Sequence, residues 1–398
     1  MTPRKRAVLH AADVAAARRI RAGRIEPGAD KRPSLYAQIQ RDAVLGWSGI
    51  LPRDQVHRDA DIDRKPDLSL IASDFLRMAG MNVPPTKAGR IEAGMKMANN
   101  VSRSYASVDD FPSWLGNTAQ RSVTLGYNDA PETWRYLCQI NTVQGFKQFH
   151  VVSLPEFPSP AEIKENAKIP RLQLGSDSKE SSALVSHTAL FGLSRQMLVN
   201  NDLTGLTTIP QALGRAASRA VGDKFFYVLV ANGLMSDGEA LFSAAHGNLI
   251  SSGAAPSVTE LDAGRTLMTA QRGPSNSILN LRPAILLCPT VLESTAVALR
   301  SAMSDATGAD DSLTPGFSAG RLAVVTDARL DDADTAAWYL LCDPRKHSGI
   351  GVHFLEGGTL PLVEQVNTFV SDSLDYKLMH DFACVPTDYR SWVKNAGA

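Results

Sequence analysis

One pentapeptide has the residue types and spacing of a catalytic nucleophile. Residues 316–320 read GFSAG, a G-x-S-x-G pattern in which Ser318 would be the attacking group. A nucleophile elbow needs a buried strand leading into the serine and a helix following it. Here the preceding ADDSLTP is polar, and the following RLAVVTD predicts a strand. We therefore interpret the pentapeptide as a loop. A serine hydrolase that uses Ser318, or a protease within the same chain, is kept only as an alternative function.

Histidines and cysteines form no pattern typical of a metal or redox site. The 8 histidines never have H-x-x-x-H spacing, and the 4 cysteines form no C-x-x-C pair. No metal or other cofactor is therefore predicted. The tripeptide His246-Gly247-Asn248 could orient an imidazole, but no nucleophile or carboxylate is matched to it, so we predict that it caps a loop. The thiols of Cys138, Cys288, Cys342 and Cys384 are expected to be buried and free.

The charges of the chain balance overall but not locally. Among 398 residues, Lys and Arg number 41 and Asp and Glu also 41, so net charge favours neither nucleic acid nor membrane. Residues 1–66 carry basic clusters and few large apolar side chains. We interpret them as a solvated helix followed by an arm or linker, rather than as a nucleic-acid-binding tail. With no secretory signal and no apolar segment of bilayer length, we expect a protein made and used in the cytoplasm.

The most regular stretch of the sequence predicts one long helix over 208–233. Its apolar residues recur at steps of three and four, as on one face of a helix. Thr208 is the expected N-cap, with Gln211 completing a capping box, and Asn232-Gly233 is the expected stop. Small residues crowd the first half of the stretch, so another backbone could approach it closely.

Shorter elements are predicted on both sides of this helix. Helices are expected over 68–80, 87–99, about 112–127, 258–272 and 290–303. Strands are expected within the apolar stretches ILNLRPAILLCP, RLAVVTD, AWYLLCD, GIGVHFLEG and DYKLMHDFACVPTDYRSW. Because helices and strands do not alternate regularly, the predicted fold class is α+β rather than a doubly wound sheet.

A polar excursion separates two segments of strand character. FKQFHVVSL and residues 183–199 alternate with a period of two and are predicted to pair as a long hairpin. Between them, residues 155–182 hold few large apolar groups, so we expect this sheet arm to need a partner. The charged residues predicted at the interface with that partner are Glu156, Glu162, Lys164, Glu165, Lys168 and Lys179.

Over residues 67–396 the chain resembles a family of viral proteins. The matching positions are Asp110-Phe111-Pro112, Leu115, Asn117, Gly126-Tyr127, Ala130-Pro131, Trp134, Phe146-Lys147, Ser194-Arg195-Gln196, Asn200-Asn201-Asp202, Leu241-Phe242, His246-Gly247-Asn248, Gly349, Val352, Phe354, Pro361, Tyr376-Lys377 and Asp388-Tyr389-Arg390. In order and spacing they resemble the capsid part of phage prohead protease/major capsid protein fusion proteins, and the Mu-like major head subunit is also similar. The protease part of such fusions is missing here.

The resemblance implies a tailed-phage major capsid protein with the fold of phage Hong Kong 97. It implies a structural subunit, not an enzyme, that self-assembles into pentamers and hexamers of an icosahedral head around double-stranded DNA, without sequence-specific binding. A portal and a prohead protease of the same phage would be partners, with assembly in the host bacterial cytoplasm and no membrane. An encapsulin-like compartment is the alternative. The implied divisions are a basic scaffold-like segment and arm (1–108), an N-terminal arm and start of the peripheral domain (109–154), the extended loop (155–182), the peripheral domain with its spine helix (183–277), the axial domain (278–345) and closing strands of the peripheral domain (346–398).

Overall fold

The computed structural model describes residues 33–97, 110–152, 179–307, 322–366 and 373–397. These residues divide into two compact units. The described residues of Met1–Ala130, His187–Ser218 and Leu360–His380 form the first unit. Those of Pro131–Ser186, Arg219–Thr359 and Asp381–Ala398 form the second. The chain is a mixture of helices and sheets, as the α+β prediction requires.

Three N-terminal helices belong to the first unit: α2 (Pro33–Trp47), α3 (Leu68–Met78) and α4 (Lys87–Met95), with the short 3-10 turn η1 (Arg53–Gln55) after α2. Asp67 caps α3 by accepting a hydrogen bond from Ser69 N, and Gly80 follows the helix with a φ of +69°. The side chain of Thr86 caps α4 in the same way. Helices predicted over 68–80 and 87–99 are therefore confirmed, the second over a shorter range.

The N-terminal helices form a core with α6 (Phe111–Asp129) and α8 (Arg195–Val199), which also belong to the first unit. The core residues from the N-terminal helices include Tyr36, Val44, Leu68, Ile71, Phe75, Leu76 and Ile91. Trp114 of α6 packs among them and donates a 3.0 Å hydrogen bond to Ala37 O. Because α2 supplies fully buried side chains, the interpretation of residues 31–66 as an arm or linker is wrong.

The longest helix of the described chain, α9 (Leu203–Ala231), spans 29 residues, up to Ser218 in the first unit and from Arg219 in the second. It begins before Thr208, so the predicted cap there is wrong; the Asp202 carboxylate accepts from Thr204 N at 3.0 Å instead. Pro210 lies inside the helix and removes one backbone donor without ending it. At the C-terminus, Asn232 rather than Gly233 takes the left-handed conformation, with a φ of +47°.

Two glycines let α6 and the first part of α9 touch backbone to backbone. A Cβ on Gly126 would lie 2.1 Å from Gln211 O, and a Cβ on Gly214 would lie 2.1 Å from Val123 O. Any side chain at either position would force the helices apart. The predicted close approach of another backbone to this half of the helix is confirmed.

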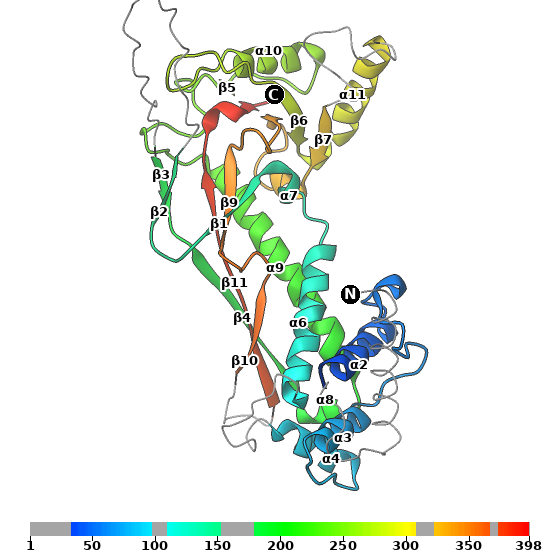
Figure 1. The fold of residues 1–398 in the computed structure, drawn as a ribbon. Helices are drawn as coiled ribbons and strands as arrows, with labels where there is room; N and C mark the ends of the chain where they lie inside the picture. The colour runs from blue at the N-terminus through cyan, green and yellow to red at the C-terminus, as the bar shows by residue number, and fades with distance from the viewer. Residues whose placement is uncertain (1–32, 98–109, 153–178, 308–321, 367–372, 398) are drawn as a thin grey trace, which may run out of the picture. The chain divides into compact units, whose positions relative to one another are not determined.

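In the first unit, β10 (Leu362–Val366) pairs antiparallel with the N-terminal part of β11 (Ser373–Pro386), from Leu362↔Met379 to Val366↔Asp375. Strand β4 (Val185–Ser194) also pairs with β11. The predicted strand over 183–199 is therefore too long, since its last residues form α8. Figure 1 shows β10 and β11 as neighbouring arrows.

The second unit contains the short helix α7 (Trp134–Leu137) and the strands β1 (Gln139–Val143) and β9 (Ile350–Leu355). β1 runs parallel to β9, which pairs antiparallel with the C-terminal part of β11. β2 (Phe149–Val152) pairs with β3 (Lys179–Ser182), from Phe149↔Ser182 to Val152↔Lys179. The predicted pairing of the segment at 146–154 with that at 183–199 is wrong, because the partner of β2 lies within the polar excursion.

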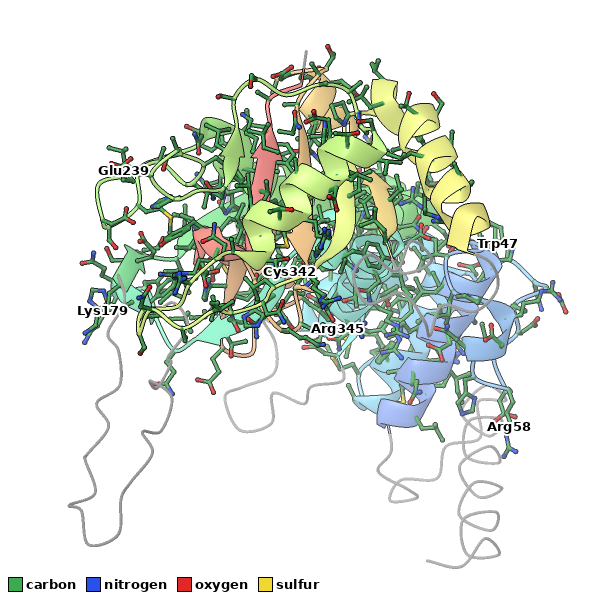
Figure 2. All side chains as sticks on the ribbon, turned by 90° about the horizontal axis from the view of Figure 1, so that it is seen from above. Trp47, Arg58, Lys179, Glu239, Cys342 and Arg345 are labelled. Carbon is green, nitrogen blue, oxygen red and sulfur yellow. The ribbon has the colours of Figure 1, made fainter. Side chains whose placement is uncertain are left out.

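The other sheet of the second unit has the order β5-β12-β8-β6-β7. Its strands are β5 (Leu249–Ile250), β6 (Pro283–Cys288), β7 (Ala323–Thr326), β8 (Trp338–Cys342) and β12 (Trp392–Asn395). Leu286 and Leu340 face α10 (Val258–Thr269) and α11 (Glu293–Thr307) in one core, while Leu287 and Leu341 join another core with α9. Figure 2 shows α10 and α11 along these strands. Burial on both faces explains the continuous apolar runs.

Candidate assembly surfaces

The predicted interface residues fall mostly outside the described residues. Glu156, Glu162, Lys164, Glu165 and Lys168 lie outside them. Lys179 opens β3 opposite Val152, and it is exposed. Figure 2 shows its side chain projecting away from the strand. Lys179 is therefore available to contact a partner, but no other residue predicted at this interface lies among the described residues.

The residue next to it, Glu180, holds β3 to a turn at Ser236 within the second unit. Glu180 is 7% exposed, and its Oε1 accepts hydrogen bonds from Ser236 N at 2.9 Å and from Ser236 Oγ at 2.7 Å. Ser236 lies in a tight turn closed by the Leu234↔Ala240 bridge, with Gly238 at a φ of +88°. The sequence reasoning missed Glu180 because it grouped the residue with the polar excursion. Burial alternates along β3, but KESS is polar at every position, so the sequence carries no signal that singles out Glu180.

His246 and Asn248 fasten the loop that follows this turn. The fully buried Asn248 accepts from Ser243 N and donates to Leu241 O and Tyr389 O. The His246 ring stacks on Tyr389 with a centroid distance of 3.7 Å, and its Nε2 lies 2.9 Å from Asp237 Oδ2. Burial acts against ionisation of Asp237, but hydrogen bonds from His246 and Glu239 N outweigh it and lower the pKa of that carboxyl. The predicted loop-capping role is confirmed.

Arg329 joins three carboxylates of the second unit. Its guanidinium bonds Glu132 at 3.0 Å, Asp223 at 2.6 Å and Asp327 at 3.2 Å. It is carried by α12 (Ala328–Asp331), which follows β7. Desolvation raises the pKa of Glu132 despite Arg329, and the neighbouring carboxylates act in the same direction. The cluster fixes α12 against α9 and the segment before α7, so its role is structural.

The other candidate groups offer no catalytic arrangement among the described residues. All four cysteines are buried and free, as predicted. Burial raises the pKa of the Cys288, Cys342 and Cys384 thiols to about 12 and raises that of Cys138 as well, so none supplies a thiolate near neutral pH. No group of metal-ligating side chains occurs in the described part of the chain. Ser318 lies outside that part.

A cavity of about 360 Å³ lies in the first unit, beside α2 and α3. Its charged lining includes Asp61, Arg64, Lys65, Asp67 and Asp74. Tyr36 donates a 2.6 Å hydrogen bond to Asp74, and this carboxylate also pairs with Arg77. Charges of both signs therefore neutralise one another around the cavity.

Among the described residues, no helix is both long and apolar enough to cross a membrane.

A family model described as phage capsid protein matches residues 179–395, more than half of the chain. The chain belongs to this phage capsid protein family. The capsid protein has no match among curated protein sequences. The matched region contains β3, the Ser236 turn, the His246 loop and the whole β5-β12-β8-β6-β7 sheet, so these features belong to the family's part of the chain.

Several solved structures are similar to the capsid protein at low sequence identity. The virus-like particle from Pyrococcus furiosus has 10% identity and a TM-score of 0.40, covering 70% of this chain and 98% of that one. The capsid of an empty GTA particle has 18% identity and a TM-score of 0.42, with coverages of 67% and 90%. The capsid of Myoviridae phage XM1 has 12% identity and a TM-score of 0.42, with coverages of 67% and 91%. The assignment rests on the family match.

Membership of this family establishes the protein's general function. The protein is a structural subunit of a phage head shell, built from many copies of this chain, and it is located in the virion capsid. It is a structural protein rather than an enzyme. This agrees with the tailed-phage major capsid protein and the Hong Kong 97-like α+β fold that the sequence resemblance implied.

Proposed function

We propose that the protein forms the pentamers and hexamers of an icosahedral tailed-phage or prophage head that encloses double-stranded DNA. The family match over residues 179–395 carries this proposal. The chain has equal numbers of basic and acidic residues, 41 of each, which suits a container that holds DNA without binding it tightly. A portal and a prohead protease of the same phage are the proposed partners, with assembly in the host bacterial cytoplasm.

Each part of the chain has a proposed place in the shell. We assign α9 as the spine helix and residues 155–182 as the extended loop that lies on a neighbouring subunit. Glu180 supports this assignment, because its bonds to Ser236 give the loop a fixed base from which to extend. The sheet β5-β12-β8-β6-β7 with α10 and α11 is the proposed axial domain. This definition adds β5, α10 and β12 to residues 278–345.

Electron microscopy of the protein expressed alone and with its phage's own protease and portal tests the proposal. We expect closed icosahedral particles whose vertices are pentamers and whose faces are hexamers. Particles filled in the phage should contain double-stranded DNA. Closed particles that contain a folded protein cargo and no DNA would favour an encapsulin-like compartment. Hydrolysis of esters or peptides that disappears in the Ser318→Ala variant would instead support the enzyme alternative.

A further inference from the structure

The outer edge of β1 presents backbone groups that the described subunit does not use. Among the described strands, β1 pairs only with β9. Gln139 N donates to Ser348 Oγ at 3.1 Å and Val143 O accepts from Glu356 N at 2.8 Å, both next to β9. In a strand, the N–H and C=O of one residue point to one side and those of the next residue to the other. Ile140 and Thr142 therefore direct their backbone groups away from β9.

The sequence of this edge lacks the usual protection against pairing. Folded proteins blunt open edges with lysine, other charges, proline or bulges. β1 reads QINTV, without a charge or a proline, and its register with β9 is continuous from Gln139 to Val143. Ile140 is 47% exposed, and the strand is flanked by Tyr136, which is 72% exposed, and Phe146, which is 50% exposed. An added strand would therefore find apolar side chains beside backbone groups that no other described strand uses.

Strand β10 shows how the same chain covers a strand edge that takes no further strand. The side-chain amide of Gln120 donates to Pro361 O at 3.0 Å and accepts from Val363 N at 2.6 Å. It thereby occupies both kinds of backbone group, as a paired strand would. β10 also carries the charge of Glu364. No described residue gives β1 a comparable cover.

We propose that β1 is a strand-addition site, at which an extended segment of a second copy of this chain pairs with Ile140 and Thr142. This inference rests on the proposed function, because a shell offers each subunit many copies of one chain as neighbours. An uncharged edge matches a neutral strand. It does not match the phosphate backbone of DNA, which needs lysine or arginine. Backbone hydrogen bonds give affinity to such added strands, and side-chain contacts give them specificity.

Two substitutions at Thr142 distinguish an effect on subunit assembly from an effect on the stability of the single subunit. Thr142→Pro removes the outward N–H and adds a ring, and proline is tolerated at a strand edge that faces solvent. Thr142→Val keeps the N–H and nearly the same shape. We expect both variants to melt near the parent's temperature as unassembled subunits. We expect Thr142→Pro to lower the yield of closed particles about tenfold or more, as loss of one or two hydrogen bonds per contact would, with Thr142→Val matching the parent.

Hydrogen exchange of the parent protein gives a second readout that does not depend on folding of the proline variant. Peptides that cover residues 138–144 should exchange about tenfold more slowly in particles than in unassembled subunits. Equal exchange in the two states, or normal particle yield from Thr142→Pro, overturns the strand-addition site and leaves the shell function standing. A parent protein that assembles no particles under any condition overturns both.

Discussion

The Glu180 carboxylate accepts two hydrogen bonds from Ser236, one from the serine's backbone N–H and one from its hydroxyl. These bonds connect β3, at the base of the extended loop, with the turn that follows the longest helix of the described chain. Glu180→Ala should lower the free energy of unfolding by about 2 kcal/mol, because the variant loses both hydrogen bonds that the buried Glu180 carboxylate accepts from Ser236. Urea unfolding of the unassembled subunit measures the change. Lys179→Ala, at the exposed neighbouring position, is the control and should stay within about 0.5 kcal/mol of the parent.

Gly222 is needed because the Glu132–Arg329 pair lies against α9. A Cβ on Gly222 would lie 2.5 Å from Glu132 Oε2 and 3.0 Å from Arg329 Nη2. Gly222→Ala should destabilise the subunit by about 1–3 kcal/mol through overpacking and a displaced ion pair. This is opposite to the gain that alanine usually brings to a helix interior.

Gly116 of α6 is the matched control for Gly222. Its nearest neighbour to a new Cβ is Tyr376 Cε1 at 3.4 Å, an ordinary van der Waals distance. Gly116→Ala should therefore leave stability unchanged or raise it by up to about 1 kcal/mol. Equal stabilisation by both substitutions in thermal unfolding would show that Gly222 makes no room for the ion pair.

We expect His353 to make the subunit less stable in mild acid. It is 5% exposed, its Nε2 has no hydrogen-bond partner among the described residues, and its ring lies 4.9 Å from that of Phe149. Burial lowers the pKa of His353 below its ordinary value of 6.5. As the pH falls below 6.5, the unfolded chain binds this proton before the folded chain does, so the free energy of unfolding decreases. Above that pH the full stability is present.

Comparison with His353→Gln isolates this effect from the other histidines. The unfolding free energy of the parent minus that of the variant should decrease as the pH falls from about 7.5 to about 5.5, because only the parent carries the buried imidazole. Urea unfolding of unassembled subunits at several pH values measures it. A difference that stays constant over this range would contradict the assignment.

The N-terminal helices should remain in the mature shell. From the basic composition and the few large apolar residues of 1–108, the sequence predicts that part of this segment is removed or disordered in mature shells, with a boundary between about Lys65 and Asp109. Yet α2, α3 and α4 bury Tyr36, Phe75 and other large side chains against α6. Removing these helices would uncover Phe111 and Trp114, and each buried aromatic contributes about 3–5 kcal/mol. Intact mass spectrometry of purified particles should find subunits that retain the chain from Pro33 onward. A mature subunit that starts after Met97 would show that this core is dispensable.

The extended loop is expected to act in assembly rather than in subunit folding. Replacing residues 158–177 with a short Gly-Ser turn spares β2, β3 and the Glu180 anchor. The variant subunit should melt near the parent's temperature, since the polar loop contributes little to a core. Closed particles should fail to form in electron micrographs. The prediction is wrong if normal closed particles form or if the subunit unfolds outright.

Several features of this protein were determined by the sequence by itself. The order and spacing of its motifs identified a phage capsid protein, and the apolar periods located the long helix, the helix capped by Ser257 and the buried strands. The isolated cysteines and the His246-Gly247-Asn248 loop were also assigned correctly. These features are local, since a helical period, a cap or a turn residue acts within a few positions of the chain.

Only the tertiary structure decided which strands are neighbours and what the N-terminal segment does. The alternation of a strand shows which residues face a core, but each strand has two edges, and the partner at each edge is chosen by packing far along the chain. Sequence patterns therefore could not show that β2 pairs with β3, or that β12 lies between β5 and β8. The apolar residues of α2 look like those of an arm or linker until α3 and α6 supply a surface that buries them. The open edge of β1 is likewise visible only once its single described partner is known, because an edge is a property of the sheet and not of the strand.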